Sequence, residues 1–532
     1  MQPIVSSRRN PHQTRQQVRT LVLSPEIPKP DGCLATAAFP PLGWWPLAWV
    51  AWVPLLLSVR GAPAGGAFRR GLVAGLVAAL GVFHWIVVVV HTYGHAPMTF
   101  ALLTLFLLAA YLALYPAAWA AGAARLGRLG EVPAIVLGAC LWVALEWVRT
   151  HLISGFPWAL LGNSQAPFLP LIQISEWTGA YGVSFVVILA NLALASLAGE
   201  LREARPVTPP WIRTAALALV ITLIVALGAG RREGIETRAR GRRPLVVGLV
   251  QGNVPQDVKW DPAFVLGSLR RHVALTADAA EWKPDLIVWP EAATTFYFQD
   301  GEALSKVIRD ASGQAGAPIF FGSSAYEPGG GGPARARRYY NSAFLVNPGG
   351  QRVGRYDKIH LVPFGEYVPF RRLLPFLSRV ATGIASGDFT PGEAPVIFPI
   401  DGRRFGALIC YEGIFPALSR DLVNHGADLL VNVTNDAWFG RSGAPGQHLQ
   451  MAVFRAVEER TGMARAANTG ISALIQPTGE ITARTGLFTM TQITGKVYPK
   501  LFRTFYARHG DVFAWACAAL AAAGLALAAR HG

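Results

Sequence analysis

Hydrophobic and polar positions divide the chain into two parts with different periods. Near both ends, uncharged apolar runs of roughly 17 to 25 residues are long enough to cross a bilayer as helices. These runs cover residues 43–59, 71–90, 99–124, 178–199, 214–230 and 512–529. A further run, 132–148, carries the single acid Glu146. The pattern therefore predicts seven membrane spans.

Between residues 244 and 505 the hydrophobic pattern changes to short apolar runs that alternate with amphipathic, charged segments. Strands are expected at 245–250, 285–289, 319–322, 342–346, 405–410, 429–433 and 471–476. Helical periodicity lies between several of them, at 262–281, 303–314 and 447–462. This alternation favours an α/β layered domain. Residues 329–338 predict a surface loop, and the long aperiodic connection 371–394 is typical of a lid or binding element.

Arginines gather in every second loop between the apolar runs. The basic loops hold Arg60, Arg69 and Arg70, then Arg125 and Arg128, then Arg202, Arg205 and Arg213. Loops 91–98 and 151–177 contain no Lys or Arg. Because basic loops stay in the cytoplasm, the alternation predicts that the α/β domain lies on the outer face and that Arg530 lies inside. A basic stretch at 231–243 falls outside, which a long translocated domain tolerates.

The front of the chain fits this topology less well. A basic cytoplasmic tail at 1–31 needs one more crossing before residue 43, and only 32–42 is available. We interpret 32–42 as a degraded or partly re-entrant first span, with a misassigned start codon as the alternative. The predicted organisation is a tail at 1–31, a membrane domain at 32–230, a linker at 231–243, a catalytic domain at 244–505 and a final span at 511–530.

Composition supports a membrane protein and excludes some functions. Of the 532 residues, 52% are hydrophobic and only 15% charged, so part of the chain must lie in lipid. The net charge of +16 is not accompanied by a nucleic-acid-binding pattern, so no nucleic acid is expected. The four cysteines show no metal or disulfide spacing, and no P-loop is present. We expect no metal and no cofactor.

Three residues with reactive side chains stand at or just past predicted strand ends, where α/β folds tend to place functional groups. Glu291 follows an apolar run and Pro290, Lys358 lies among apolar residues, and Cys410 ends a strand before a turn. Each alone has an ordinary explanation: a turn acid, a solvated lysine and a buried structural cysteine. Their conjunction favours catalysis, because a thiol attacks a carbonyl as thiolate and needs a base and a nearby cation.

The same residues carry a resemblance. The order Glu291, Lys358, Cys410 with these flanks resembles the nitrilase superfamily, and the added spans are similar to its membrane-embedded branch, the apolipoprotein N-acyltransferase family. The resemblance begins at Phe39-Pro40-Pro41. Further matching segments are Gly155-Phe156-Pro157-Trp158, Gln251-Gly252-Asn253-Val254-Pro255-Gln256, Lys259-Trp260-Asp261, His360-Leu361-Val362-Pro363-Phe364-Gly365-Glu366 and Asn435-Asp436-Ala437-Trp438-Phe439-Gly440.

The resemblance implies a polytopic α-helical membrane domain plus a nitrilase-like αββα sandwich domain. It implies transfer of an acyl chain from a phospholipid to the N-terminal amine of a diacylated apolipoprotein, in the bacterial inner membrane, by a protein we expect to be a monomer. Glu291 then matches the general base, Lys358 the catalytic lysine and Cys410 the nucleophile. Four supporting positions match as well: Glu366, Tyr411, Glu412 and Trp260.

From the residues alone, Glu366 is expected to orient Lys358, Tyr411 to supply a backbone N–H beside the thiol, and Glu412 to tune the local charge. For Trp260 the alternative interpretation is packing at the domain surface. For residues 435–440 the alternative is an ordinary turn. In the membrane half, Glu146 and Arg149 lie three apart on one helix face, which predicts either a structural ion pair or a functional site.

Two rival functions stay open. A membrane-tethered amidase would use the same triad to hydrolyse a small amide, although a tether needs only one span. A transporter with a sensor domain would show polar residues in several spans and internal repeats, and the spans show almost none.

Overall fold

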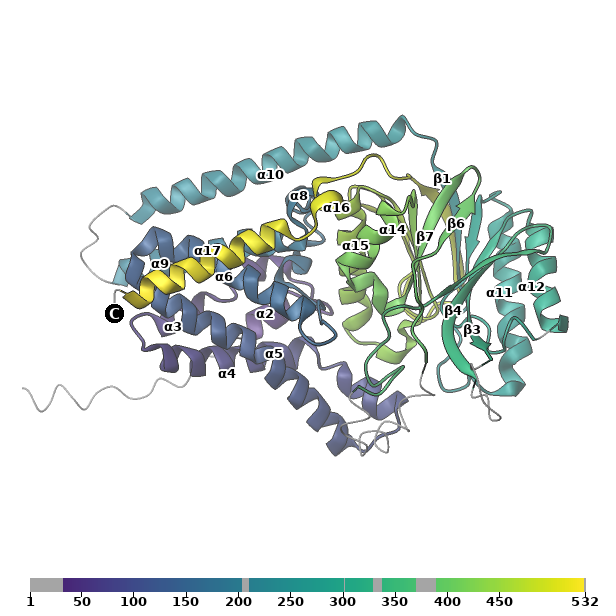
Figure 1. The fold of residues 1–532 in the computed structure, drawn as a ribbon, viewed down its shortest axis with the longest axis horizontal. Coiled ribbons are helices and arrows are strands. Elements are labelled where there is room, and N and C mark those ends of the chain that lie inside the picture. Colours follow the sequence, from purple (N-terminus) through teal and green to yellow (C-terminus); the bar gives the residue numbers. More distant parts are fainter. Residues whose placement is uncertain (1–31, 203–209, 301, 329–336, 370–388, 531–532) are drawn as a thin grey trace, which may run out of the picture.

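The computed structural model describes residues 32–202, 210–300, 302–328, 337–369 and 389–530. A bundle of helices forms one half and two β-sheets flanked by helices form the other (Figure 1). The predicted tail 1–31, much of the basic loop at 202–213, most of the loop 329–338 and most of the connection 371–394 lie outside the described residues.

Six helices in the described part of the chain are long and apolar enough to cross a membrane. They are α4 (Ala64–Val82), α5 (Met98–Leu126), α6 (Glu131–His151), α9 (Ala180–Arg202), α10 (Pro210–Arg240) and α17 (Val512–Arg530). Close packing of α4 on α5 requires small residues, since a Cβ on Gly71 would lie 2.7 Å from the carbonyl oxygen of Pro116. The helical bundle agrees with the predicted membrane domain.

The expected span at 43–59 is wrong as a single helix. The chain there forms a short 3₁₀ helix, Trp45–Trp49, and then α3 (Val53–Val59). Pro46 and Pro54 stand in the first positions of these two pieces. Proline has no N–H to continue a preceding helix but is suited to start a new one, so the apolar run is divided. Residues 32–42 form only the five-residue helix α2 (Cys33–Ala37) followed by turns.

The basic segment that was expected to be a linker is largely helical. Helix α10 continues through Arg240, so residues 231–240 extend the last span before the sheets as one rod (Figure 1). Arg231 forms an ion pair with Glu176 at 2.7 Å. The ion pair compensates the charge of Arg231, so this basic stretch can continue the helix instead of forming a separate linker.

Two six-stranded sheets face each other in the second half. The first has the order β12-β1-β2-β3-β4-β5 and the second β11-β10-β9-β8-β7-β6. Apolar side chains from both sheets, among them Val247, Val288, Phe320, Ala407 and Val431, form the core between them. Helices α11 (Val265–Ala280) and α12 (Glu302–Ala315) cover the outer face of the first sheet, and α14 (Pro416–Asn424) and α15 (Ala444–Glu459) cover that of the second (Figure 1). The αββα prediction is confirmed.

Every predicted strand is present. They are β1 (Leu245–Gln251), β2 (Leu286–Val288), β3 (Ile319–Glu327), β4 (Arg338–Val346), β7 (Arg403–Ile409), β8 (Leu429–Thr434) and β10 (Ala473–Ile475). The missed strands are β5 (Arg352–Asp357), β6 (Ile397–Ile400), β9 (Met463–Ala467), β11 (Ile481–Arg484) and β12 (Thr491–Val497). Four of the missed five, all but the fully buried β9, are partly exposed and polar or short, so they lack the apolar run that the others have.

Helix α15 is the junction between the sandwich and the membrane domain. All of its residues except Gly446 are buried. The Gln447 side-chain oxygen accepts from the indoles of Trp158 at 2.8 Å and Trp85 at 3.2 Å, and its amide donates to the carbonyls of Pro40 and Val82. Because these partners belong to the helical half, α15 fixes one half of the molecule against the other.

A buried ion pair lies at the end of the same helix. Arg460, which follows α15, is fully buried and pairs with Glu176 at 2.7 Å. It also donates to the side-chain oxygen of Gln173 at 2.6 Å and to the carbonyl of Pro477 at 3.0 Å. A charge without water needs such a set of partners, so this arginine joins three segments.

The first prediction concerns this ion pair. Glu176→Ala leaves the Arg460 guanidinium buried without its counter-charge, which typically costs about 3–5 kcal/mol. We expect a clearly lower midpoint of thermal unfolding in detergent. Glu480→Ala is the matched control, because Glu480 is 43% exposed and its pair with Arg232 is 3.4 Å long. Exposed pairs contribute at most about 1 kcal/mol, and equal shifts in the two variants would contradict the assignment.

Candidate active site

The three residues singled out from the sequence meet at one end of the sandwich. Glu291 follows β2 and Lys358 follows β5, both in the first sheet, while Cys410 follows β7 in the second. All three are buried, with 7%, 1% and 9% of their surface exposed. The site therefore lies between the two sheets, where water is largely excluded.

Lys358 is held between two carboxylates. Its Nζ donates to Oε1 of Glu366 at 2.9 Å and lies 3.7 Å from Oε1 of Glu291. Oε2 of Glu366 accepts from the backbone N–H of Val362 at 2.7 Å. Burial lowers the pKa of Lys358, but Glu366 and Glu291 raise it by more, so the net shift is upward. The ammonium is therefore kept charged in a site that would otherwise neutralise it.

Asn341 on β4 links the two carboxylates, and sequence reasoning missed it. Its side-chain amide donates to Oε1 of Glu291 at 2.8 Å and to Oε1 of Glu366 at 2.7 Å. The backbone carbonyl of Asn341 also accepts from the N–H of Lys358 at 2.8 Å. The signal that could have found it is an amide side chain directly before the apolar run of β4, at the strand end that faces the other site residues.

The second oxygen of Glu291 points to the loop after β8. The N–H of Asn435 donates to Oε2 of Glu291 at 2.8 Å. The Asn435 side chain donates to Gln256 and accepts from Asn468, so the motif at 435–440 has a role in positioning. Lys259 also reaches this region, with Nζ donating to the Glu291 carbonyl at 3.3 Å, and burial lowers the pKa of Lys259 to about 8.

Cys410 stands on a backbone bend directly after β7. Its φ of +52° lies in the left-handed region, which costs energy for any residue other than glycine. The Cys410 carbonyl accepts from Nε2 of His448 at 3.2 Å and from the amide of Asn432 at 3.4 Å. These two donors stabilise the bend that turns the thiol away from the strand direction.

The two donors are themselves fixed by a buried ionic network. Because a carbonyl only accepts, His448 carries a proton on Nε2, and its Nδ1 lies 3.0 Å from Nη2 of Arg465 and 3.1 Å from Oδ1 of Asp436. Arg465 also pairs with Asp436 at 2.8 Å and contacts Asn432. Burial would raise the pKa of Asp436, but Arg465 and His448 lower it to about 2. Arg465 and His448 carried no sequence signal, since their partners are distant in the chain.

Glu412 links the two sheets near the site through its hydrogen bonds. Its carboxylate is fully buried and accepts four hydrogen bonds. One oxygen accepts from the Tyr356 hydroxyl and the N–H groups of Ile359 and His360, and the other from the N–H of Ile409. Glu412 therefore ties the segment after Lys358 to the end of the strand that carries Cys410. Its charge also contributes to raising the pKa of Lys358, in line with the charge tuning expected from the sequence.

The remaining predicted residues lie at the edge of the site. Tyr411 is buried, and its hydroxyl donates to the carbonyl of Gly155 at 3.4 Å, so it contacts the membrane domain. Trp260 is 49% exposed, in a turn two residues before the short helix that precedes α11. This exposure is compatible both with packing at the domain surface and with a role in binding.

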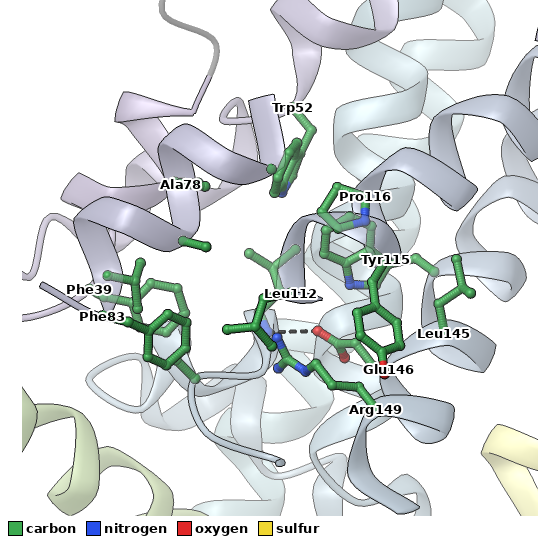
Figure 2. Close-up of a pocket in the computed structure, with 17 residues that line it drawn as sticks. Phe39, Trp52, Ala78, Phe83, Leu112, Tyr115, Pro116, Leu145, Glu146 and Arg149 are labelled. Carbon is green, nitrogen blue, oxygen red and sulfur yellow. Dashed lines mark hydrogen bonds between the residues drawn. The ribbon is translucent and has the colours of Figure 1, made fainter. Parts of the chain in front are cut away.

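Glu146 and Arg149 line a separate cavity of about 90 Å³ between α4, α5 and α6. Figure 2 shows them on one side, across from Phe39 and Phe83. Oε1 of Glu146 accepts from the N–H of Leu161 at 2.8 Å, and Arg149 donates to the carbonyl of Trp158 at 3.3 Å. The loop after α6 therefore satisfies both charges in part.

A buried thiol flanked by a carboxylate and an ammonium, at strand ends of an αββα sandwich, defines a carbon–nitrogen-hydrolase-type site in a membrane-embedded chain. The profile of the carbon-nitrogen hydrolase family matches residues 246–505, and that of the apolipoprotein N-acyltransferase N-terminal domain matches residues 31–193. The chain belongs to the apolipoprotein N-acyltransferase family.

Whole-length relatives support this membership. The apolipoprotein N-acyltransferase of Geobacter metallireducens is 45% identical over 506 residues, which is 94% of each chain. That of Azotobacter vinelandii is 36% identical and covers 92% of each chain. Among solved structures, an amidase from Nesterenkonia sp. is 20% identical with a TM-score of 0.36, covering 51% of this chain and 94% of its own.

The second prediction tests the charges around the thiol. Burial raises the pKa of Cys410 most, Glu291 raises it further and Lys358 lowers it. Because alkylation by neutral iodoacetamide follows the thiolate fraction, we expect its pH profile at Cys410 to move to lower pH in Glu291→Gln. The same profile should move to higher pH in Lys358→Met. Peptide mass mapping reads each cysteine separately, and shifts of the same sign in both variants would contradict this electrostatic arrangement.

Proposed function

We propose that this chain transfers a fatty acyl chain from a phospholipid to the N-terminal amine of the diacylglyceryl-cysteine of bacterial lipoproteins, through a thioester on Cys410. The observation that carries the proposal is the buried Cys410 thiol beside Glu291 and Lys358 in a chain whose relatives are apolipoprotein N-acyltransferases. A site that excludes water favours transfer to an amine over hydrolysis.

In the first half-reaction Glu291 takes the proton of the Cys410 thiol, and the thiolate attacks the ester carbonyl of the phospholipid. Lys358 and the N–H of Tyr411 stabilise the oxyanion of the tetrahedral intermediate. The intermediate collapses when the carbon–oxygen bond breaks, and the lysophospholipid alkoxide leaves with the proton that Glu291 held. A thioester on Cys410 remains.

In the second half-reaction the neutral amine of the lipoprotein attacks the thioester carbonyl. Glu291 accepts the proton that the nitrogen loses as the amide bond forms. The carbon–sulfur bond breaks, and the proton returns from Glu291 to the departing thiolate. The chemistry needs no group from outside the chain and its two substrates.

Three residues position these groups without touching substrate. Glu366 keeps Lys358 charged, Asn341 holds Glu366 and Glu291 at a fixed separation, and Glu412 fixes the Lys358 segment against the Cys410 strand. Trp260 is exposed, and its chain neighbour Lys259 contacts the carbonyl of Glu291. Trp260 is therefore a candidate for contact with an incoming lipid chain. Tyr411 joins the site to the membrane half.

The proposed location is the bacterial inner membrane with residues 244–505 on the outer face. Supporting this, Tyr93 at the end of the π-helix η2 (Val88–Tyr93) packs on Trp438, and the loop after α6 reaches α15 through Trp158. Both predicted loops that lack basic residues therefore lie on the sandwich side. Since α4 runs from Ala64 toward that side, Arg60 lies at the opposite end, as a cytoplasmic arginine should. The proposed acceptor is one diacylated apolipoprotein per monomer.

The third prediction concerns Lys358. Lys358→Ala removes one oxyanion donor and should lower the rate of N-acylation by about 10²- to 10³-fold, since such donors act mainly in the transition state. Activity is measured on a diacylated lipopeptide with phospholipid as donor. Lys306→Ala is the matched control, because its ammonium is on the surface and its side chain is 70% exposed. A full rate in Lys358→Ala would remove this lysine from the mechanism.

The fourth prediction separates transfer from the amidase-like alternative. Wild type given phospholipid and lipopeptide should form the N-acylated peptide with little free fatty acid, because the buried thioester is shielded from water. Cys410→Ala should form neither product. Mass spectrometry of both products decides the matter: fatty acid released in excess of acylated peptide would favour a hydrolase, and activity in Cys410→Ala would contradict the proposal.

A further inference from the structure

A second polar cavity, away from Cys410, lies where two spans end. It has a volume of about 340 Å³ and lies between the last residues of α6 and the first of α17, below α14. Its lining comprises Trp147, His151, Arg420, Asn424, Ala507, Arg508, His509, Gly510, Asp511 and Trp515. His151 ends α6, and Asp511 immediately precedes α17. The cavity is therefore at the depth where hydrocarbon gives way to headgroups.

Positive charge dominates the lining. Two guanidinium groups, those of Arg420 and Arg508, stand against one acid, Asp511, among the described residues that form the wall, and His151 and His509 add ring nitrogens. Asp511 is already engaged, because Oδ1 accepts from the Tyr506 hydroxyl at 2.8 Å and Oδ2 accepts from the Trp147 indole at 3.1 Å. A cationic ligand would be repelled by the arginines and would find no free carboxylate. An anionic ligand would be attracted by the excess positive charge of the arginines.

Arg420 supplies the most specific feature. Its Nη1 is buried, has no hydrogen-bond partner among the residues that the structure describes and lies 3.9 Å from Oδ1 of Asp511, too far for a hydrogen bond. The guanidinium is fixed over the ring of Tyr506 and beside Gly510, where a Cβ would lie 2.8 Å from Nη1. A guanidinium that is held in place and keeps one buried, unused N–H is suited to a phosphate oxygen.

The apolar surface beside the cavity indicates where the phosphate comes from. Trp515 is 54% exposed at the rim, Val512 is exposed at the start of α17, and Leu520 and Leu527 are exposed further along this helix. This face of a membrane-spanning helix is where the acyl chains of a lipid would run. A free phosphate has no apolar part that could contact this surface.

We propose that this cavity binds the phosphate of an anionic phospholipid as a bound lipid distinct from the acyl donor. Arg420 and Arg508 hold the phosphate oxygens, the two tryptophans flank the glycerol region, and the chains lie along α17. The bound lipid links α14, which follows Cys410 within six residues, to the membrane surface.

The test uses ether-linked lipids, which have no ester and cannot donate an acyl group, so failure here is distinguishable from failure of the proposed reaction. Native mass spectrometry of the full chain in detergent measures retention of dialkyl phosphatidylglycerol and of dialkyl phosphatidylcholine. We expect wild type to retain the anionic lipid preferentially. Arg420→Gln/Arg508→Gln should lower that retention by about tenfold or more, as loss of charged hydrogen bonds does.

The matched control is Arg484→Gln/Lys496→Gln, which removes the same charge from exposed positions on β11 and β12 and should keep full retention. Arg508→Gln alone keeps the test possible if the double variant does not fold. Equal retention in wild type and the arginine variants, or equal retention of both lipids, would overturn the proposal. Displacement of the lipid by inorganic phosphate at the same concentration would also overturn it, in favour of a free-phosphate site.

Discussion

Everything at the centre of this molecule depends on keeping one ammonium charged without water. Lys358 is 1% exposed, and burial alone would neutralise it. Glu366 and Glu291 offset that penalty, and Asn341 holds the two carboxylates so that both face the same nitrogen. Lys259 adds a second cation near Glu291. A thiolate then adds a charge that the ammonium can stabilise for as long as the attack lasts.

The fixed geometry around that charge comes from hydrogen bonds that join the two sheets near the site. Glu412 connects the Lys358 segment to the end of β7, and His448 with Asn432 holds the bend at Cys410. Both sets of hydrogen bonds are buried. Within each set, removing one partner leaves another buried polar atom unsatisfied. Helix α15 carries His448 toward the site and Gln447 toward the membrane half. The catalytic geometry and the seating of the sandwich on the bundle thus share one element.

The sequence predicts the parts of this arrangement that local patterns encode. Apolar runs ending in Glu291 and Cys410 placed these side chains at strand ends, and the seven strands with clear runs are all present. Asn341, His448 and Arg465 were missed because their roles arise from contacts between segments far apart in the chain. Helix α15 has the charges of a solvated face, with Arg455, Glu458 and Glu459, yet it is buried on all sides. In the membrane half, hydropathy could not show that prolines divide the run at 43–59.

The most direct test of the account is the intermediate itself. The full-length protein is incubated with a phospholipid and no acceptor, and its intact mass and cysteine-containing peptides are measured. The account predicts an added acyl mass on Cys410, removed by neutral hydroxylamine, absent in Cys410→Ser under those conditions and lost when a diacylated lipopeptide is added. Absence of any adduct on Cys410, in a preparation that still N-acylates the lipopeptide, would contradict the thioester mechanism.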